Sequence, residues 1–291
     1  MGKNLHFKTI GFVAMCAALI ITVSCDGMFT AEITQSAESI GVSGISVYPK
    51  QLEMALGESS NQLEARIVPA NASNQLIIWE SSDPSVATVD ANGVVTAGYA
   101  SGVAVVVASS ADGEHLLDSA VLVVGEDLIG KQGPAGGLIF YEDVDDNHPW
   151  RFLEAAPAGW HDGGQQGPSS VWSNVTNASV GTTSTSIGAG LANTLAIIAQ
   201  EGHEESAANT AAVFSLERYG VIYADWFLPS RGELAEMYTN LRVQGLGGFE
   251  QTKWASSETS GNLAHAQQFG NGTLRSDPKG IDRRLRPIRA F

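Results

Sequence analysis

The sequence predicts a multidomain protein in which an all-β sandwich is followed by an α+β domain. Residues 41–125 contain short runs rich in valine and isoleucine, broken by turn residues roughly every ten positions, which is the pattern of a β-sandwich. Residues 126–291 combine short strands with tryptophan, alanine and helical periodicity, which is typical of an α+β domain. A length of 291 residues accommodates about two such domains.

A hydrophobic leader precedes both domains. Two lysines are followed by the apolar run 10–23, and the leader ends with a small residue before Cys25. That order is a secretory signal peptide, and the junction resembles that of bacterial lipoproteins, so residues 1–25 are predicted to be a lipoprotein signal peptide with Cys25 lipidated. Thr22 stands where leucine is usual, which leaves ordinary signal-peptidase cleavage and an uncleaved anchor open. Residues 26–40 are polar and are predicted to be a flexible tether.

Charge and cysteine usage exclude several functions. The formal net charge is -15, and loss of the two leader lysines would make it about -17, so no nucleic-acid partner is expected. Cys16 lies in the leader and Cys25 would carry lipid, so no thiol remains for a disulfide, for thiol catalysis or for a cysteine metal site. Both domains must therefore fold on packing alone, and we predict no cofactor.

The strands of the first domain can be placed from the valine and isoleucine runs and the turns between them. The tight turn Asp90-Ala91-Asn92-Gly93 should join two of them. The expected strands are 45–48, 62–68, 76–80, 86–89, 94–96, 103–109 and 118–124.

This segment resembles the bacterial immunoglobulin-like group 2 family. The resemblance is carried by the runs IWESSDPSVATVD at 78–90 and GVVTA at 93–97, with ISVYP at 45–49 and VPANA at 68–72 in the same order. It implies an immunoglobulin-like sandwich serving as a surface-exposed spacer or adhesion module, without naming a ligand. Trp79 is expected to be the core aromatic between the two sheets.

The second domain should contain an acidic hairpin, several helices and a C-terminal group of strands. Ser230 and Glu233 form a capping box at the start of one helix. The helix 188–200 should bury an apolar face made by Ile187, Leu191, Leu195 and Ile198. The other expected elements are strands 139–141, 150–154, 253–256, 264–269 and 284–290 and a helix at 206–217.

Residues 129–291 resemble the Lcl C-terminal family, named after a collagen-like adhesin. The matching blocks are GPAGGLIFY at 133–141, WRFLEAAP at 150–157, DWFLPS at 225–230, WASSE at 254–258 and RPIRAF at 286–291. The resemblance implies a C-type-lectin-like fold related to formylglycine-generating enzymes. That oxidase chemistry needs cysteines that are absent here, and the sugar-binding motifs of calcium-dependent C-type lectins do not occur.

Several side chains are candidates for metal binding or acid–base chemistry. Asp143, Asp145, Asp146 and Asn147 could supply oxygen ligands to calcium, or they could form a solvated hairpin loop. His161-Asp162 and His203-Glu204-Glu205 could bind metal or act as a base, or they could be ordinary surface residues. Ser257, Glu258 and His265 could form a hydrolase set, although no nucleophile elbow surrounds a serine.

The C-terminal segment is basic within an acidic protein, and it supplies the candidate ligand-binding residues. Arg275, Lys279, Arg283 and Arg284 are predicted to grip sulfated or carboxylated glycans. Trp160 and Trp172 could stack on sugar rings, or they could plug the space beneath a long loop. The remaining arginines, Arg286 and Arg289, are expected to pair with buried carboxylates such as Asp225 or Glu233.

The order of leader, spacer and second domain predicts a bacterial cell-envelope protein, lipid-anchored and facing outward. Its expected partners are the membrane, through the N-terminal lipid, and a glycan or an extracellular matrix protein. We expect binding or adhesion rather than catalysis. Two alternatives remain: a cell-envelope hydrolase using carboxylates of the C-terminal domain, and a structural component of the envelope.

Overall fold

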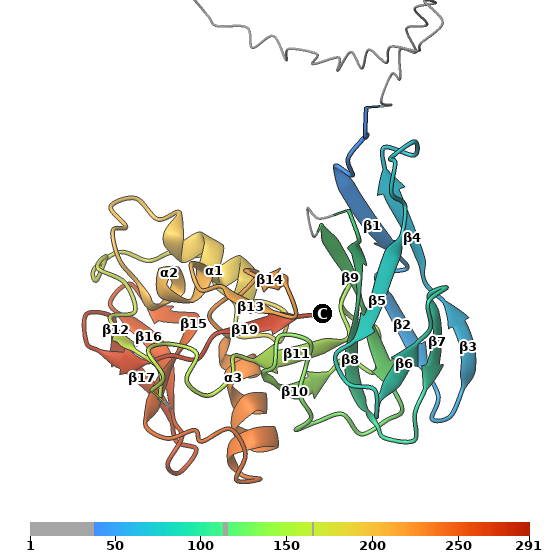
Figure 1. Ribbon diagram of the computed structural model, residues 1–291. Coiled ribbons are helices and arrows are strands. Elements are labelled where there is room, and N and C mark those ends of the chain that lie inside the picture. Colours follow the sequence, from blue (N-terminus) through green and yellow to red (C-terminus); the bar gives the residue numbers. More distant parts are fainter. Residues whose placement is uncertain (1–37, 113–115, 165) are drawn as a thin grey trace, which may run out of the picture.

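The computed structural model describes residues 38–112, 116–164 and 166–291. The predicted leader, its Cys25 and most of the predicted tether lie outside the described residues. Figure 1 shows two domains side by side, a β-sandwich followed by a mostly β domain that carries short helices. Within the described residues, no helix is long and apolar enough to span a membrane.

The first domain contains three small sheets. One pairs β1 (Gly44–Tyr48) with β4 (Glu64–Val68), and a second has the order β2 (Gln51–Met54), β9 (Leu117–Val124), β8 (Gly102–Ser110) and β5 (Ile77–Ser81). The third has the order β3 (Ser59–Gln62), β7 (Val94–Ala97) and β6 (Ala87–Val89). All seven expected strands are present. The sequence did not predict β2 or β3, because QLEM and SSNQ carry no apolar strand pattern.

The turn between β6 and β7 has the predicted chemistry. Asp90 Oδ1 accepts hydrogen bonds from the backbone N–H of Asn92 at 2.8 Å and of Val94 at 2.9 Å, and Gly93 takes a φ of 81°. Trp79 differs from expectation, because it is only partly buried and packs against the edge of the core rather than at its centre. A Cβ on Gly93 would lie 2.9 Å from the Trp79 ring, so glycine is also what lets this ring approach the turn.

The second domain has two sheets and a separate hairpin. The first sheet has the order β10 (Leu138–Glu142), β11 (Phe152–Ala155) and β19 (Ile288–Ala290). The second has the order β12 (Ser169–Ser170), β18 (Arg283–Arg284), β15 (Thr252–Ser260), β16 (Leu263–Gln268) and β17 (Leu274–Pro278), and the hairpin joins β13 (Leu216–Arg218) to β14 (Val221–Tyr223). The helices are α1 (Gly190–Ile198), α2 (Ala207–Ala212) and α3 (Arg231–Met237), which continues into a π-helix (Tyr238–Arg242).

Two boundaries in this domain differ from the sequence prediction. The helix expected at 206–217 ends at Ala212, and its last residues belong to β13. The strand expected at 284–290 is divided into β18 and β19, which join different sheets. The predicted capping box is confirmed, with the Ser230 side chain accepting from the Glu233 N–H and the Glu233 carboxylate accepting from the Ser230 N–H.

The predicted apolar face of α1 was wrong. Leu191 and Leu195 are 49% and 56% exposed, whereas Asn193 and Thr194 are buried. Asn193 exchanges hydrogen bonds with the backbone of Ser184, and Thr194 does so with the backbone of Leu228. A helix can bury polar side chains when every donor and acceptor finds a partner, and hydrophobic periodicity does not detect this.

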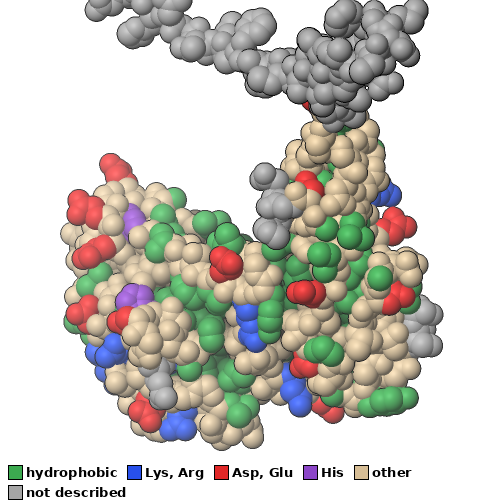
Figure 2. Space-filling view, viewed as in Figure 1, with side chains coloured by type: hydrophobic (Ala, Val, Ile, Leu, Met, Phe, Trp, Pro, Cys, Tyr) green, Lys and Arg blue, Asp and Glu red, His purple; other side chains and the backbone are tan. Residues whose placement is uncertain are grey.

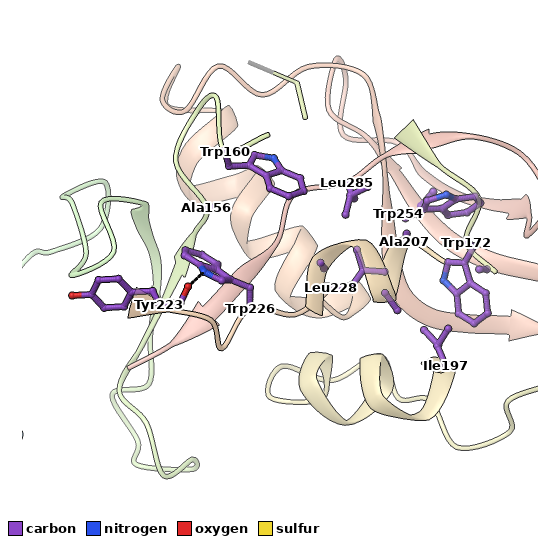
Figure 3. Packing of buried hydrophobic residues seen from close by; sticks show 14 of the residues in the cluster. Ala156, Trp160, Trp172, Ile197, Ala207, Tyr223, Trp226, Leu228, Trp254 and Leu285 are labelled. Carbon is purple, nitrogen blue, oxygen red and sulfur yellow. Dashed lines mark hydrogen bonds between the residues drawn. The ribbon is translucent and has the colours of Figure 1, made fainter. Parts of the chain in front are cut away.

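The core of the second domain is rich in tryptophan. Figure 3 shows Trp172, Trp226 and Trp254 packed among aliphatic residues from several elements. Their indole N–H groups donate to the carbonyls of Ala255, Tyr223 and Ser170, respectively. The large rings therefore fill the interior without leaving these donors unpaired.

A buried ion cluster joins β11 to β19 beside this core. Arg289 binds Asp225 in a bidentate pair at 2.8 and 2.9 Å and donates to Glu154 at 2.7 Å. The Glu154 carboxylate also accepts from the backbone N–H groups of Ala135 and Gly137. Burial raises the pKa of Glu154 above its ordinary value, and the cation and amides oppose that shift. Arg289 thus pairs with Asp225 as expected, although the Asp225 side chain is 54% exposed rather than buried. The hydrogen bonds described for Arg286 go to the carbonyls of Ala156 and Pro157 and not to a carboxylate.

The two domains share an apolar interface formed by one face of β9, while its other face belongs to the sandwich core. Alternate residues of this strand, such as Leu122, enter the sandwich core, while Val121 and Val123 contact a separate cluster that includes Ile139 and Phe152. The Phe291 ring stacks on Phe152 with centroids 5.4 Å apart. A strand covered on both faces reads as a continuous apolar run, which explains the uninterrupted sequence VLVV.

Replacement of Val123 by Asp should separate the domains. The new carboxylate would lie within the apolar interface, where an unpaired charge costs several kcal/mol. Small-angle scattering should show a larger radius of gyration, while circular dichroism keeps its β signal. Val213→Asp is the matched control, because Val213 is 69% exposed. An unchanged scattering curve for Val123→Asp would contradict this interface.

Replacement of Arg289 by Met should destabilise the protein by about 3–5 kcal/mol, because it leaves the Glu154 carboxylate buried without its cation. Urea unfolding followed by tryptophan fluorescence measures this loss. Arg66, with a side chain 80% exposed, provides the control, and Arg66→Met should change the unfolding free energy by less than about 0.5 kcal/mol. Equal unfolding free energies for the two variants would show that the ion cluster does not stabilise the fold as predicted.

Candidate functional site

The acidic loop between β10 and β11 is held by its own side chains. Asp143 is buried and accepts hydrogen bonds from the backbone N–H of His148 at 2.7 Å and from its ring nitrogen at 2.9 Å. Asp145, Asp146 and Asn147 are exposed. Within the described residues, no three His, Cys, Asp or Glu side chains are grouped to hold a metal ion. The geometry favours the solvated-loop interpretation over the calcium one.

Three of the predicted ligand-binding residues prove to be buried. Trp172 is fully buried and Trp160 is 9% exposed, so neither presents a flat face to a sugar. Lys279 is also fully buried, where it donates to Glu258 at 2.5 Å and lies 4.7 Å from the Trp172 ring centroid. For Lys279 the prediction was wrong, because the acid that neutralises it comes from a distant strand. For the two tryptophans the structure favours the alternative in which they fill space beneath a loop.

Glu258 is the centre of this buried arrangement. Its carboxylate accepts from Lys279, from the Ser179 hydroxyl and from the backbone N–H groups of Val180 and Gly181. Burial acts against its charge, but these hydrogen bonds outweigh burial and lower the pKa of Glu258. An ionised, fully engaged carboxylate holds the loop at 179–181 in place.

The other acid–base candidates also have structural partners. Ser257 Oγ donates to the Ser184 carbonyl at 2.7 Å and accepts from the Arg231 N–H. His203 Nε2 lies 2.8 Å from Ser206 Oγ, the cap of α2, and His161 pairs with Asp162 at the surface. These contacts favour structural roles for all three residues.

The remaining arginines lie at the surface of the second domain. Arg275 and Arg283 both bind Asp277, with Arg283 Nε donating at 2.8 Å. Burial opposes the charge of Asp277, but the two arginines lower its pKa. Their side chains remain 43% and 28% exposed, so each guanidinium is anchored at one edge and accessible at another.

Arg283 and Arg284 line an open groove of about 420 Å³ where β12, β18, β15 and β16 meet. Arg284 donates from Nε to Gln251 Oε1 at 3.1 Å and from Nη1 to the Gly167 carbonyl at 2.6 Å. Its Nη2 has no partner in the described part of the chain and remains available to a ligand. The other lining residues are Ser169, Gln251, Thr252, Gln268 and Asp282.

The sequence prediction identified the two arginines of this groove and missed its amides and hydroxyls. Gln251 directly precedes β15 and Gln268 ends β16, where Thr252 faces Gln268 in the strand register. Guanidinium, amide and hydroxyl groups in one groove can bind a polar anionic ligand. Only the strand pairing brings these residues together, and no local sequence motif predicts the groove.

Buried cations lie next to the groove. Lys253, which pairs with Arg284 across β15 and β18, is fully buried and lies 5.5 Å from the Phe269 ring centroid. Arg286 is also fully buried, and its guanidinium lies 4.7 Å from the Phe249 ring centroid while donating to the carbonyls of Ala156 and Pro157. Burial and the nearby arginines lower the pKa of Lys253 to about 7. Lys253 therefore loses its positive charge as the pH rises through about 7, and the cations that line the groove itself are Arg283 and Arg284.

The unfolding free energy should rise between about pH 7 and pH 10.5 through Lys253. Over that range the unfolded chain binds a proton at Lys253 and the folded chain does not, so a higher pH favours folding. The gain is on the order of a few kcal/mol. Urea unfolding at several pH values should show a smaller slope for Lys253→Met than for the parent chain. Superimposable pH profiles would show that Lys253 is not perturbed.

Comparison with known proteins assigns the first domain. Residues 41–119 match the family model described as bacterial Ig-like domain (group 2). An Ig-like virion protein of Serratia phage KSP90 is 36% identical over 114 residues, which are 38% of this chain and 44% of that protein. The lacto-N-biosidase of Bifidobacterium bifidum is 37% identical over 105 residues, which are 35% of this chain and 9% of that enzyme. The chain thus spans less than half the length of each relative.

Solved structures resemble the chain only loosely. A fimbrial protein from Bacteroides ovatus aligns with a TM-score of 0.36 and 10% identity, covering 85% of this chain and 71% of that one. An intimin mutant from EHEC O157:H7 aligns with a TM-score of 0.23 and 12% identity, covering 82% and 87% of the two chains. These scores are too low to establish a shared fold over the whole chain. The family match, together with the observed sandwich, shows that residues 41–119 are a bacterial Ig-like domain of group 2.

Proposed function

We propose that the protein is a cell-envelope binding protein whose second domain captures anionic glycans in the groove beside Arg284. The observation that carries this proposal is the convergence of Arg283 and Arg284 with the amides of Gln251 and Gln268 in one open groove. A guanidinium with a free edge pairs with sulfate or carboxylate, and amides bind sugar hydroxyls. The positive charge that attracts anions comes from Arg283 and Arg284, which line the groove directly.

The position of the groove suits presentation by a spacer. Figure 1 places β12 and β17 of the second domain on the side away from the Ig-like sandwich. The apolar interface at Val123 and Phe152 would hold that orientation fixed. Together these features support a function in which the Ig-like domain carries the groove away from its attachment point.

We also propose that the protein is anchored to the membrane through Cys25 and that its second domain belongs to the Lcl C-terminal family. A lipid on Cys25 would tie the protein to the bacterial membrane and place both domains on its outer surface. The resemblance of 129–291 to the Lcl C-terminal family, with a C-type-lectin-like fold, supports an adhesive role towards glycans or an extracellular matrix protein. The Ig-like assignment of 41–119 agrees with an envelope or extracellular location.

We propose binding without catalysis. The buried carboxylates of Glu154, Asp277 and Glu258 each accept hydrogen bonds from a cation, and Glu233 accepts them from backbone amides. Engaged carboxylates of this kind serve the fold, whereas a general acid or base needs access to a substrate. These contacts weigh against the hydrolase alternative.

Retention on immobilised dextran sulfate tests the proposed function, with unsulfated dextran as the neutral matrix. The full chain should bind the sulfated matrix saturably and release from it as salt rises. The double variant Arg283→Gln/Arg284→Gln should weaken binding by roughly 100-fold or more, since it removes two charged hydrogen bonds that contribute about 1.5–3 kcal/mol each.

Arg66→Gln is the control. It removes one positive charge, as each groove substitution does, but from an exposed position on the Ig-like domain. It should bind like the parent chain. Equal weakening by the Arg66 and groove variants would show that binding follows net charge, which would refute the groove. Absence of saturable binding to dextran sulfate would refute the proposal altogether.

A further inference from the structure

A second hollow lies between the two domains. It encloses about 280 Å³, and both domains contribute to its wall. The Ig-like domain supplies the segment from Ser82 to Val86 and Ser101, and the second domain supplies the loop 131–134 and the tip of the β13–β14 hairpin. Small-molecule sites occur preferentially at domain interfaces and span roughly 300–1,000 Å³. The volume suits one or two rings better than a peptide.

The hairpin tip places Tyr219 at this hollow in a strained conformation. Tyr219 and Gly220 join β13 to β14 with φ values of 54° and 75°. A two-residue turn with both φ values positive favours asparagine, aspartate or glycine, and a bulky side chain at the first position is strained. The hollow gives a reason to keep tyrosine there, because strained residues cluster at binding sites.

Docking of the domains does not explain the tyrosine. Gly220, not Tyr219, makes the close approach to the first domain, since a Cβ on Gly220 would lie 2.5 Å from Leu117 of β9. The Tyr219 residue is 42% exposed. The Arg218 guanidinium lies over the Tyr219 ring, 4.9 Å from the ring centroid, in a cation–π contact.

Two cations face the hollow without an acidic partner among the described residues. Arg218 Nη2 donates to Gln132 Oε1 at 3.3 Å and to Tyr219 Oη at 3.0 Å, and Nη1 packs against Gly136, where a Cβ would lie 1.9 Å from it, so the guanidinium is held in place at this wall. Lys131 is exposed at the same wall and forms no ion pair with a described residue. Two uncompensated cations in a protein of net charge -15 favour an anionic group in the ligand.

The opposite wall provides acceptors and hydroxyl groups. Asp83 Oδ1 accepts from the N–H of Ser85 at 3.0 Å and from its hydroxyl at 2.6 Å, and these bonds lower the pKa of Asp83. The carboxylate is therefore ionised, and it can also accept from a ligand hydroxyl. Ser82 and Ser101 add side-chain oxygens to the lining. A ligand for this wall must carry several hydroxyl groups.

From these features we infer that the hollow between the domains binds a carboxylated sugar. The ligand carboxylate would pair with Arg218 and Lys131, its hydroxyls would donate to Asp83, and one face of its ring would lie near Tyr219. Such a site needs both domains in their docked arrangement. It is separate from the groove beside Arg284 and would operate whether or not that groove binds sulfated chains.

Titration of the full chain with D-glucuronate, followed by ligand-observed NMR, tests the inference, with D-glucose as the neutral probe. Glucuronate should bind saturably and at least tenfold more tightly than glucose. Absence of saturable glucuronate binding, or equal binding of the two sugars, would overturn the inference.

Tyr219→Asn is the decisive variant, because asparagine suits the turn better than tyrosine. This variant should keep or raise the unfolding midpoint and lose at least tenfold in affinity for glucuronate. Arg218→Gln should lose affinity to a similar extent, whereas Arg66→Gln on the outer surface should not. Unchanged affinity in a folded Tyr219→Asn protein would refute the site.

The glucuronate and dextran sulfate measurements test different sites, so a negative result in one does not decide the other. Loss of glucuronate binding alone would remove the interdomain site and leave the proposed groove intact. Loss of dextran sulfate binding alone would remove the groove and leave the interdomain site.

Discussion

The second domain is organised around one buried cation, Arg289. A guanidinium in a low-dielectric interior is stable only where carboxylates and good hydrogen-bond geometry surround it. Meeting that requirement brings β19, β11, the turn at Asp225 and the loop 133–137 to a single point. These four segments coincide with four of the sequence blocks that resemble the Lcl C-terminal family. Each of these four blocks supplies one part of the same polar cluster.

The domain interface depends on a different constraint, the double burial of β9. Leu122 and its alternate neighbours stabilise the sandwich, while Val121 and Val123 dock the second domain. The same strand therefore belongs to two hydrophobic clusters. An apolar interface of this kind fixes the orientation of one domain relative to the other, whereas a flexible linker alone would only limit the distance between them.

The sequence was sufficient where structure follows from local pattern. Examples are the valine runs, the Asp90 turn and the Ser230 capping box. The interactions that form each of them lie within a few residues of one another in sequence. Prediction failed where partners are remote. Lys279 was expected at the surface because its partner Glu258 lies on another strand, and Leu191 was expected inside because the hydrogen bonds of Asn193 depend on tertiary contacts. The groove amides were missed for the same reason, since only the pairing of β15 with β16 brings them together.

The loop 133–137 has an inner side and an outer side. On the inner side its amides bind Glu154, and a Cβ on Gly133 would lie 2.3 Å from that carboxylate, so the loop fits against it with no room to spare. On the outer side, Gly133 and Pro134 line the hollow between the domains. That wall is rigid before any ligand arrives, so a ligand there gives up little conformational entropy of the protein. The buried Glu154 carboxylate thus fixes the loop 133–137, and through that loop it fixes one wall of the hollow between the domains.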